Sequence, residues 1–152
     1  MLDLVEGAKI VMGLAPTTAS IVESEWINTE NMHCVWAIVT KSLSKGSSQY
    51  ISAEAGDNYA GTGAANVAAK YWKSTNPNFT RFTASTASTG VMAGATAFNA
   101  VVVRYDPSVA DTSQNYFSVA LTSGWGCAVT YICEPRYGGA APTAGGIATS
   151  ST

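Results

Sequence analysis

An all-β fold is what this sequence predicts: an antiparallel β-sandwich, or a jelly-roll or barrel-like domain, with one or two short helical turns and an extended C-terminal arm. First, apolar and polar residues alternate with a period of two in several short stretches. Second, clusters of Gly, Pro, Asn, Asp or Ser bound these stretches at intervals of roughly 8 to 12 residues, which is typical of sandwiches and barrels. Third, 152 residues make one ordinary domain that can bury roughly 70% of its unfolded surface. We therefore expect one β domain over residues 1–137 and an arm over residues 138–152.

Seven stretches are expected to form strands. In chain order they are residues 9–15 (KIVMGLA), 20–27 (SIVESEWI), 33–40 (HCVWAIVT), 49–55 (QYISAEA), 100–106 (AVVVRYD), 116–123 (YFSVALTS) and 127–133 (CAVTYIC). Residues 33–40 are apolar on both faces, which predicts a central strand covered on both sides, with Trp36 in the core. Residues 20–27 place Glu23 and Glu25 on one face, which predicts a half-exposed strand.

The segments between these strands give weaker signals. Asp106 as a cap and Pro107 at the first position predict a helix of one or two turns. Residues 61–75 (GTGAANVAAKYWKST) predict a turn or short helix that enters a strand. Residues 82–97 are rich in small residues without a helical stripe, and predict a surface loop or paired edge segments.

Composition and charge argue against several partners. Only 12% of the residues are charged, about half the usual share, and such a neutral surface suits a protein that packs against neighbours. The net charge is −2 and the 8 basic residues are scattered, so we expect no nucleic-acid partner. Asp3 and Glu6 lie where a secretory signal would carry basic residues. No stretch approaches the ~20 apolar residues of a membrane span, so we expect a chain made in the cytoplasm with no membrane partner.

The three cysteines are expected to be free and buried. Cys127 and Cys133 are six residues apart in one strand, so they face the same side at a separation of ~20 Å. That distance is far beyond disulfide reach. Cys34 could pair with only one of them, and free Cys is often buried as a small hydrophobe.

The residues that could carry catalysis do not form a convincing site, so we expect no enzyme, no metal and no cofactor. His33 is the only histidine, and its neighbour Cys34 points to the opposite face of the strand. No C-x-x-C spacing supports a zinc site. Glu23 and Glu25 lie ~7 Å apart on one strand face, but glycosidase carboxylates usually come from different strands that line a cleft. Gly61–Gly63 lacks the rest of a phosphate-binding fingerprint.

The tryptophans are compatible with a carbohydrate-binding site. Trp125 lies between Gly124 and Gly126 at an expected hairpin tip, where exposure for contact and simple turn packing are equally consistent with the sequence. With Trp72 it could form a sugar-stacking platform.

Three blocks of the sequence resemble a family of small tailed-bacteriophage virion proteins. These blocks are an opening Lys-Ile-Val strand that ends in Ala-Pro, a strand-Asp-turn-Asp-x-x-x-x-Tyr-strand unit, and a last strand that closes with Pro-Arg-Tyr before a small-residue tail. The matching positions are Lys9–Pro16, Val101–Leu121 and Pro135–Tyr137, whereas residues 55–98 match nothing. The resemblance implies a β-rich virion subunit, above all an auxiliary capsid protein that decorates and cements the shell.

The resemblance also implies partners and contact residues. The partners are the major capsid protein and copies of this chain, on the capsid surface of the virion, and both trimers and dimers suit a shell. Pro135 ends the last strand, Arg136 can form a bidentate contact with a neighbour's carboxylate, and Tyr137 can bury its ring. An ordinary surface role is equally open for Arg136. Trp125 is a further candidate contact.

The arm suggests how such a protein holds its neighbours. Residues 138–152 carry no charged side chain and could span ~50 Å when extended. Laid over a neighbouring subunit, the arm can donate main-chain hydrogen bonds to an exposed sheet edge. Two other functions stay open: a tail or neck subunit that acts as tube, stopper or head-to-tail joint, and a carbohydrate-binding adhesin.

Overall fold

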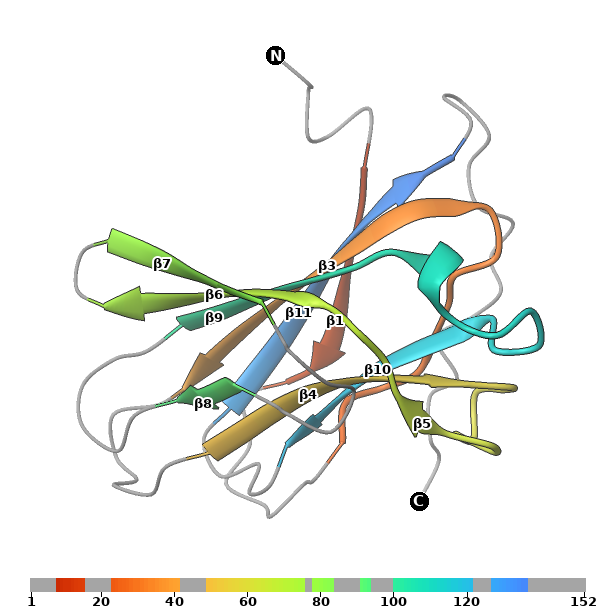
Figure 1. Cartoon of the computed structure of the whole chain (residues 1–152), viewed down its shortest axis with the longest axis horizontal. Coiled ribbons are helices and arrows are strands. Elements are labelled where there is room, and N and C mark those ends of the chain that lie inside the picture. Colours follow the sequence, from red (N-terminus) through yellow and green to blue (C-terminus); the bar gives the residue numbers. More distant parts are fainter. Residues whose placement is uncertain are drawn as a thin grey trace.

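The protein is an all-β sandwich in its computed structural model, which describes residues 8–15, 23–41, 49–75, 78–83, 91–93, 100–121 and 127–136. Two antiparallel sheets form two layers (Figure 1). Sheet A has the order β1 (Lys9–Leu14), β11 (Cys127–Pro135), β3 (Met32–Lys41), β9 (Ala100–Tyr105), β6 (Lys70–Thr75), β7 (Asn78–Thr83). Sheet B has the order β2 (Ile27–Asn28), β10 (Tyr116–Leu121), β4 (Gln49–Gly56), β5 (Ala65–Asn66), and β8 (Val91–Ala93) pairs with β4.

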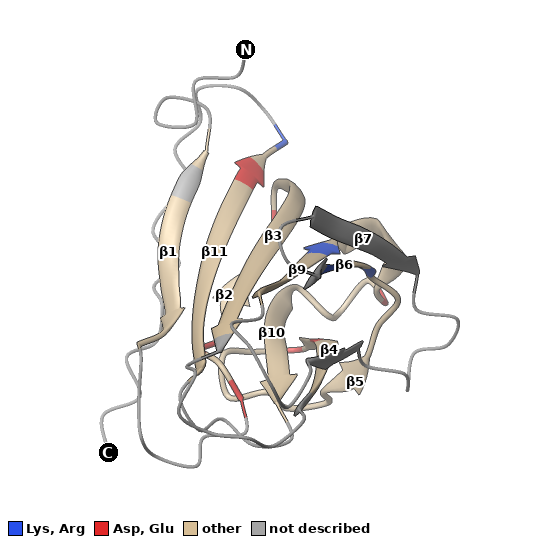
Figure 2. Cartoon of the chain, turned by 90° about the vertical axis from the view of Figure 1, so that its left-hand side faces the viewer, with Lys and Arg blue, Asp and Glu red and all other residues tan. Residues whose placement is uncertain are grey.

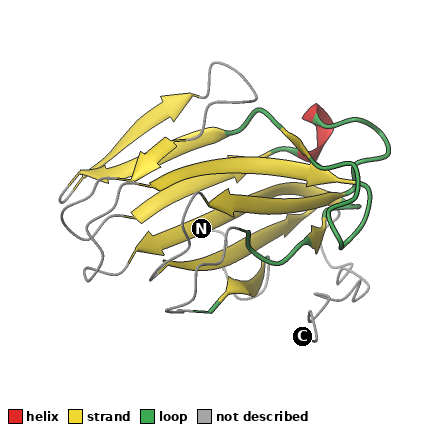
Figure 3. Cartoon of the chain, turned by 90° about the horizontal axis from the view of Figure 1, so that it is seen from below, coloured by secondary structure: helices red, strands yellow, loops and turns green. Residues whose placement is uncertain are grey.

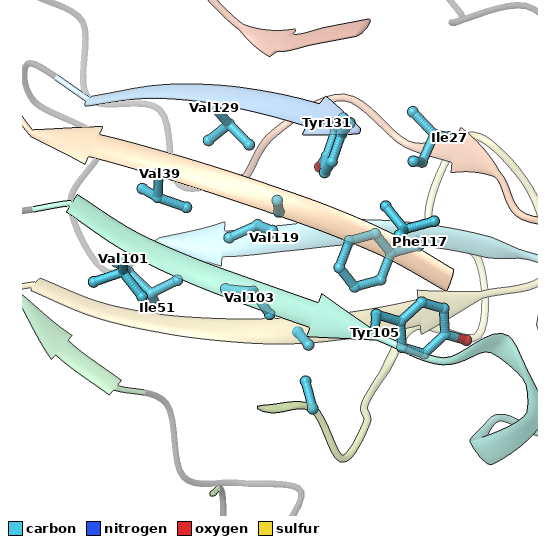
Figure 4. Close-up of a cluster of buried hydrophobic side chains, with 14 of the residues drawn as sticks. Ile27, Val39, Ile51, Val101, Val103, Tyr105, Phe117, Val119, Val129 and Tyr131 are labelled. Atoms are coloured by element: carbon cyan, nitrogen blue, oxygen red, sulfur yellow. The ribbon is translucent and has the colours of Figure 1, made fainter. Parts of the chain in front are cut away.

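The core lies between the two sheets and follows the alternation in the sequence. Each central strand turns alternate side chains inward, so that Val35, Ala37 and Val39 of β3 are at most 2% exposed. Aromatic rings fill one end of the core (Figure 4). Tyr105 stacks on Phe117 with ring centroids 4.5 Å apart, and Phe117 meets the edge of Tyr131 at 5.9 Å. Both contacts lie in the range that aromatic pairs prefer.

The outer face of β3 corrects one expectation. Strand β3 is central, between β11 and β9, but Trp36 and Ile38 on its outer face are only half-buried. The prediction of Trp36 as a core residue is therefore wrong. Sheet B packs against the inner face of sheet A (Figure 3), and Trp36 and Ile38 point to the other face, where they stay partly exposed.

The expected strand over residues 20–27 is also wrong for its described part. Glu23 forms an isolated bridge with Ala120, and regular pairing begins only at β2. The cause is Ser24, which is 3% exposed and turns into the sandwich, where its hydroxyl hydrogen-bonds to Tyr131 Oη. The next residue, Glu25, donates its backbone N–H to Gly13 of β1 at 2.8 Å. The segment thus joins the edges of both sheets instead of extending along one.

The turn signals are confirmed where the structure describes them. Pro107–Val109 form one 3₁₀ turn (η1), and Asp106 caps it by accepting the Ser108 N–H at 3.0 Å. Residues 61–75 contain a turn and the strands β5 and β6, without a helix. Within residues 82–97, Val91–Ala93 pair with β4, and most of the rest lies outside the described residues. None of the described residues forms a helix long and apolar enough to cross a membrane.

Candidate interaction surface

The outer face of sheet A carries two adjacent rows of side chains that cross five strands. Because cross-strand partners in an antiparallel sheet point to the same side, the register defines these rows. We call them together the outer band. The first row runs over Ile10, Ile132, Trp36, Arg104 and Lys70, and the second over Met12, Thr130, Ile38, Val102 and Trp72.

Most of the outer band is apolar and accessible. Ile10 is 56% and Met12 62% exposed, and Ile38, Val102 and Ile132 are half-buried. Single exposed apolar residues are ordinary on a protein surface, but a contiguous apolar patch indicates a place where another molecule binds. The outer band is such a patch, because its members are direct neighbours across β1, β11, β3, β9 and β6.

An aromatic cluster forms the centre of the outer band. The ring centroids of Trp36 and Trp72 are 5.5 Å apart with planes tilted by 33°. The guanidinium carbon of Arg104 lies 5.5 Å from the centroid of the Trp36 ring, a cation–π distance. Trp and Arg are the residues most enriched among those that dominate binding energy at protein interfaces.

Glu134 fixes the orientation of Trp36 from the neighbouring strand. Its carboxylate accepts the Trp36 Nε1–H at 3.0 Å and the Cys34 thiol at 3.1 Å. Burial, followed by the hydrogen bond with this carboxylate, raises the pKa of Cys34 to about 11. The thiol is therefore protonated at neutral pH and is a structural donor rather than a nucleophile. Cys34, Cys127 and Cys133 are all free and buried, as expected from the sequence.

Charges of both signs lie on this face, on opposite sides of β3. Glu134 is on β11, whereas Arg104 is on β9 and Lys70 is on β6. Figure 2 shows acidic colour at the end of β11 and basic colour near β9 and β6. This face is thus apolar along β3, with a negative charge on the β11 side and positive charges on the β9 and β6 side.

The residues predicted to contact partners lie at one end of sheet A. Pro135 is the last residue of β11 and pairs with Met32 after a shift in register. Arg136 is exposed and donates its backbone N–H to Asn31 at 2.7 Å, which leaves the guanidinium side chain at the surface. Asn31 adopts a left-handed φ of 67°, as tight turns require. Tyr137 and Trp125 lie outside the described residues, so their predicted contacts stay predictions.

A second cluster of charge lies on the other sheet. Glu23 lies near Glu54 of β4 rather than Glu25, and the two carboxyl groups interact electrostatically. Burial raises the pKa of Glu23, and the negative charge of Glu54 raises it further. Burial also raises the pKa of Glu54. Two carboxyl groups so close retain a proton more readily than either does alone.

The groups considered for catalysis or metal binding are kept apart in the described residues. His33 is exposed at the start of β3, while the thiol of Cys34 bonds to Glu134. The described residues bring together no set of three His, Cys, Asp or Glu side chains that could hold a metal ion. Trp26 is buried, with 5% of its surface exposed.

The sequence contained a signal for the outer band that the strand prediction did not use. In residues 33–40 the even positions are as apolar as the odd ones, and we interpreted this as burial on both faces. The same pattern also describes a strand whose second face binds a partner. Only the register, which aligns Ile38 with Val102 and Thr130, shows that these side chains form one surface.

Comparison with known proteins gives one similar fold. No protein-family model matches the chain, and no curated protein sequence matches it significantly. The crystal structure of the SPBc2 prophage-derived protein YomS is similar, with a TM-score of 0.51, 83% of this chain and 91% of that chain covered, and 12% sequence identity. At this identity the likeness is one of fold. A sandwich of this kind is therefore found in at least one prophage-derived protein.

Proposed function

We propose that this chain is a structural protein of a tailed phage particle that decorates the capsid and cements neighbouring capsid subunits. The observation that carries the proposal is the outer band, an exposed and mostly apolar sheet face, on a fold similar to that of a prophage-derived protein. The phage-like sequence blocks of the first and last strands and the low share of charged residues support the same assignment.

The mechanism is non-catalytic. Each copy makes several weak contacts, and symmetry repeats these contacts around the shell, so that separating two shell subunits requires breaking many of them together. Contacts made only in the assembled shell stabilise it by mass action. The end of β11, with Pro135 and Arg136, and the following arm supply the contacts with the major capsid protein.

The proposal is tested with shells assembled with and without this chain. Purified shells that lack the chain are mixed with it, repurified, and examined for bound copies and for resistance to heat. We expect several hundred copies per shell and a higher temperature of shell disruption. A shell that takes up no copies, while complete particles contain a small multiple of six or twelve at the tail or neck, moves the protein to a tube, stopper or joining role.

One observation favours a second candidate function. Trp36 and Trp72 present two neighbouring indole rings on the outer face of sheet A, an arrangement on which a sugar ring can stack. A carbohydrate-binding adhesin would bind glycans on an array, and Trp72→Ala would abolish that binding. An array without signal at any glycan removes this alternative.

A further inference from the structure

We propose that the outer band binds a segment of a neighbouring capsid subunit that carries acidic side chains at one end and apolar side chains along the rest. The inference rests on the proposed function and names the chemistry of the partner that covers this face. Three features of the face carry it: the basic strands β9, β6 and β7, the cross-strand pair of Lys70 and Arg104, and the apolar rows beside them.

The strands on one side of β3 contain half of the basic residues of the chain. Strands β9, β6 and β7 are adjacent in sheet A and contain no Asp or Glu. Their basic residues are Arg104, Lys70, Lys73 and Arg81, which are four of the 8 in the whole chain. These residues are scattered along the sequence, but the sheet brings their strands together. In a chain with a net charge of −2, this side of sheet A is therefore a local basic region.

Lys70 and Arg104 form a like-charge pair on the outer face. They are direct partners in the register of β6 and β9, so their side chains start about 5 Å apart on the same side of the sheet. Like charges directly opposite each other destabilise a sheet, and an anion that lies over both offsets their repulsion. Lys70 is exposed, and the register places a further basic residue, Arg81, opposite Trp72. The pair therefore favours a carboxylate on the partner.

Two acidic residues flank this region, and both bind neutral donors. Glu134 accepts the Trp36 Nε1–H at 3.0 Å, and Asp106 accepts the backbone N–H of Ser108 at 3.0 Å and its hydroxyl at 2.8 Å. In the part of the chain that the structure describes, Arg104 lies 5.5 Å from the centroid of the Trp36 ring, and no ion pair joins it to either carboxylate. The positive charge of this region is thus available to a partner.

The apolar residues of the outer band require an amphipathic partner. Beyond β3 the rows continue over Ile132 to Ile10 and Met12, which are both more than half exposed. Five strands about 4.8 Å apart make the band about 19 Å long, the length of about six residues of extended chain. A protein segment offers apolar side chains to this half of the band, whereas a sugar or a nucleic-acid backbone does not. The acidic end of the segment therefore lies over Lys70, and its apolar end lies over β11 and β1.

The outer band is too small to hold this partner alone. Two rows about 7 Å apart and about 19 Å long give a flat strip far below the roughly 800 Å² per partner of a stable interface. A chain that also contacts the shell through the end of β11 gains from both contacts, because the second contact forms at a high effective concentration. Each copy then bridges two capsid subunits, as the cementing function requires.

The first test titrates purified shells that lack this chain with the full chain and measures the bound copies by co-sedimentation. Lys70→Gln removes one charge of the pair, and we expect it to weaken binding about three- to tenfold at about 50 mM NaCl. Tyr59→Glu is the matched control, because it lowers the net charge by the same amount at an exposed position between β4 and β5 of sheet B. At about 500 mM NaCl the effect of Lys70→Gln should shrink, since salt screens exposed charges. Equal affinities of the two variants at low salt overturn the proposal.

The second test identifies the group that faces Lys70. A carbodiimide joins an amine to a carboxylate when the two are in contact, so shells that carry the chain are treated with it, digested and analysed by mass spectrometry. We expect Lys70 to be linked to an Asp or Glu of the capsid protein, and Lys70→Arg to keep the binding but lose the link. A link from Lys70 to another copy of this chain, or links between chain and shell elsewhere with none at Lys70, overturns the proposal.

The outcomes separate this inference from the proposed function. A wild-type chain that binds no shell overturns both. Binding to shells that is the same in the wild type and in Lys70→Gln retains the capsid role and overturns the acidic partner. A chain that binds polygalacturonate without shells, and loses that binding in Lys70→Gln, assigns this face to an anionic glycan and overturns the capsid partner.

Discussion

Gly13 is one residue whose lack of a side chain decides how β1 packs. A Cβ atom at this position would overlap the ring of Tyr131, and the register of β1 against β11 shifts at the same place. Tyr131 is fully buried, and its hydroxyl hydrogen-bonds to Ser24 and to the backbone oxygen of Glu25. One glycine thus lets the aromatic ring link three separate segments.

We expect Gly13→Ala to destabilise the fold by about 2 kcal/mol, because the ring cannot move without losing its hydrogen bonds. Urea unfolding measures the free energy. In a Tyr131→Leu background, the same substitution should cost much less, since the overlapping ring atoms are gone. Equal costs in the two backgrounds would contradict this account of Gly13.

The carboxyl pair of Glu23 and Glu54 makes stability depend on pH. The folded state raises the pKa of both groups above the ordinary value of 4.5, so it binds protons more tightly than the unfolded chain does. This contribution to stability is complete below that value and is lost as the pH rises through the folded pKa.

We therefore expect the free energy of unfolding to fall as the pH rises above about 4.5, and Glu54→Gln to reduce that fall. Urea unfolding at several pH values measures it, with the exposed Glu30→Gln as the matched control. If Glu54→Gln and Glu30→Gln have the same slope against pH, the pair does not control the dependence.

At the scale of elements, the sequence predicts that β3 is a strand but does not predict which residues of other strands lie beside it. Period-two alternation is sufficient to predict a strand where one face is buried, as in β11, where Val129 and Tyr131 are fully buried. Alternation fails over residues 20–27, because Ser24 is bound by a hydroxyl that lies 107 residues away in the chain. Strand β6 lies at the end of residues 61–75, where the sequence predicts a strand, whereas β7 was not predicted. The neighbours of Trp36 depend on register, which a single strand does not encode.

Substitutions on the two faces of β3 should lower the free energy of unfolding by different amounts. Val39 is 2% exposed in the core, so Val39→Ala is expected to cost about 2 kcal/mol. Ile38→Ala removes more atoms but should cost the monomer less than Val39→Ala, because Ile38 is half-exposed. Urea unfolding at a dilution that keeps the chain monomeric compares them. A larger cost for Ile38→Ala would mean that the outer face is packed within the monomer.

At the scale of the whole molecule, two parts of sheet A are distinct in the proposed particle. One is the exposed outer band, and the other is the end of β11 with the arm, to which we assign the contact with the shell. The candidate contacts Pro135 and Arg136 were accessible to sequence reasoning because they end a strand and resemble a motif. The outer band could not be predicted from the sequence, because its residues come from five strands that are distant in sequence.

Removing residues 137–152 tests the role of the arm. We expect the shortened chain to stay folded, measured by circular dichroism, and to lose most of its binding to shells. A variant with Arg136→Ala in the full chain is the companion, with a smaller loss expected. Shell binding that survives removal of the arm contradicts the role that we assign to it.

Electron cryo-microscopy of complete particles that contain this chain tests the central claim most directly. The account predicts several hundred copies on the outside of the capsid, each with its outer band against a neighbouring subunit. Copies confined to the tail or neck, or capsid-bound copies whose outer band faces solvent, would contradict it.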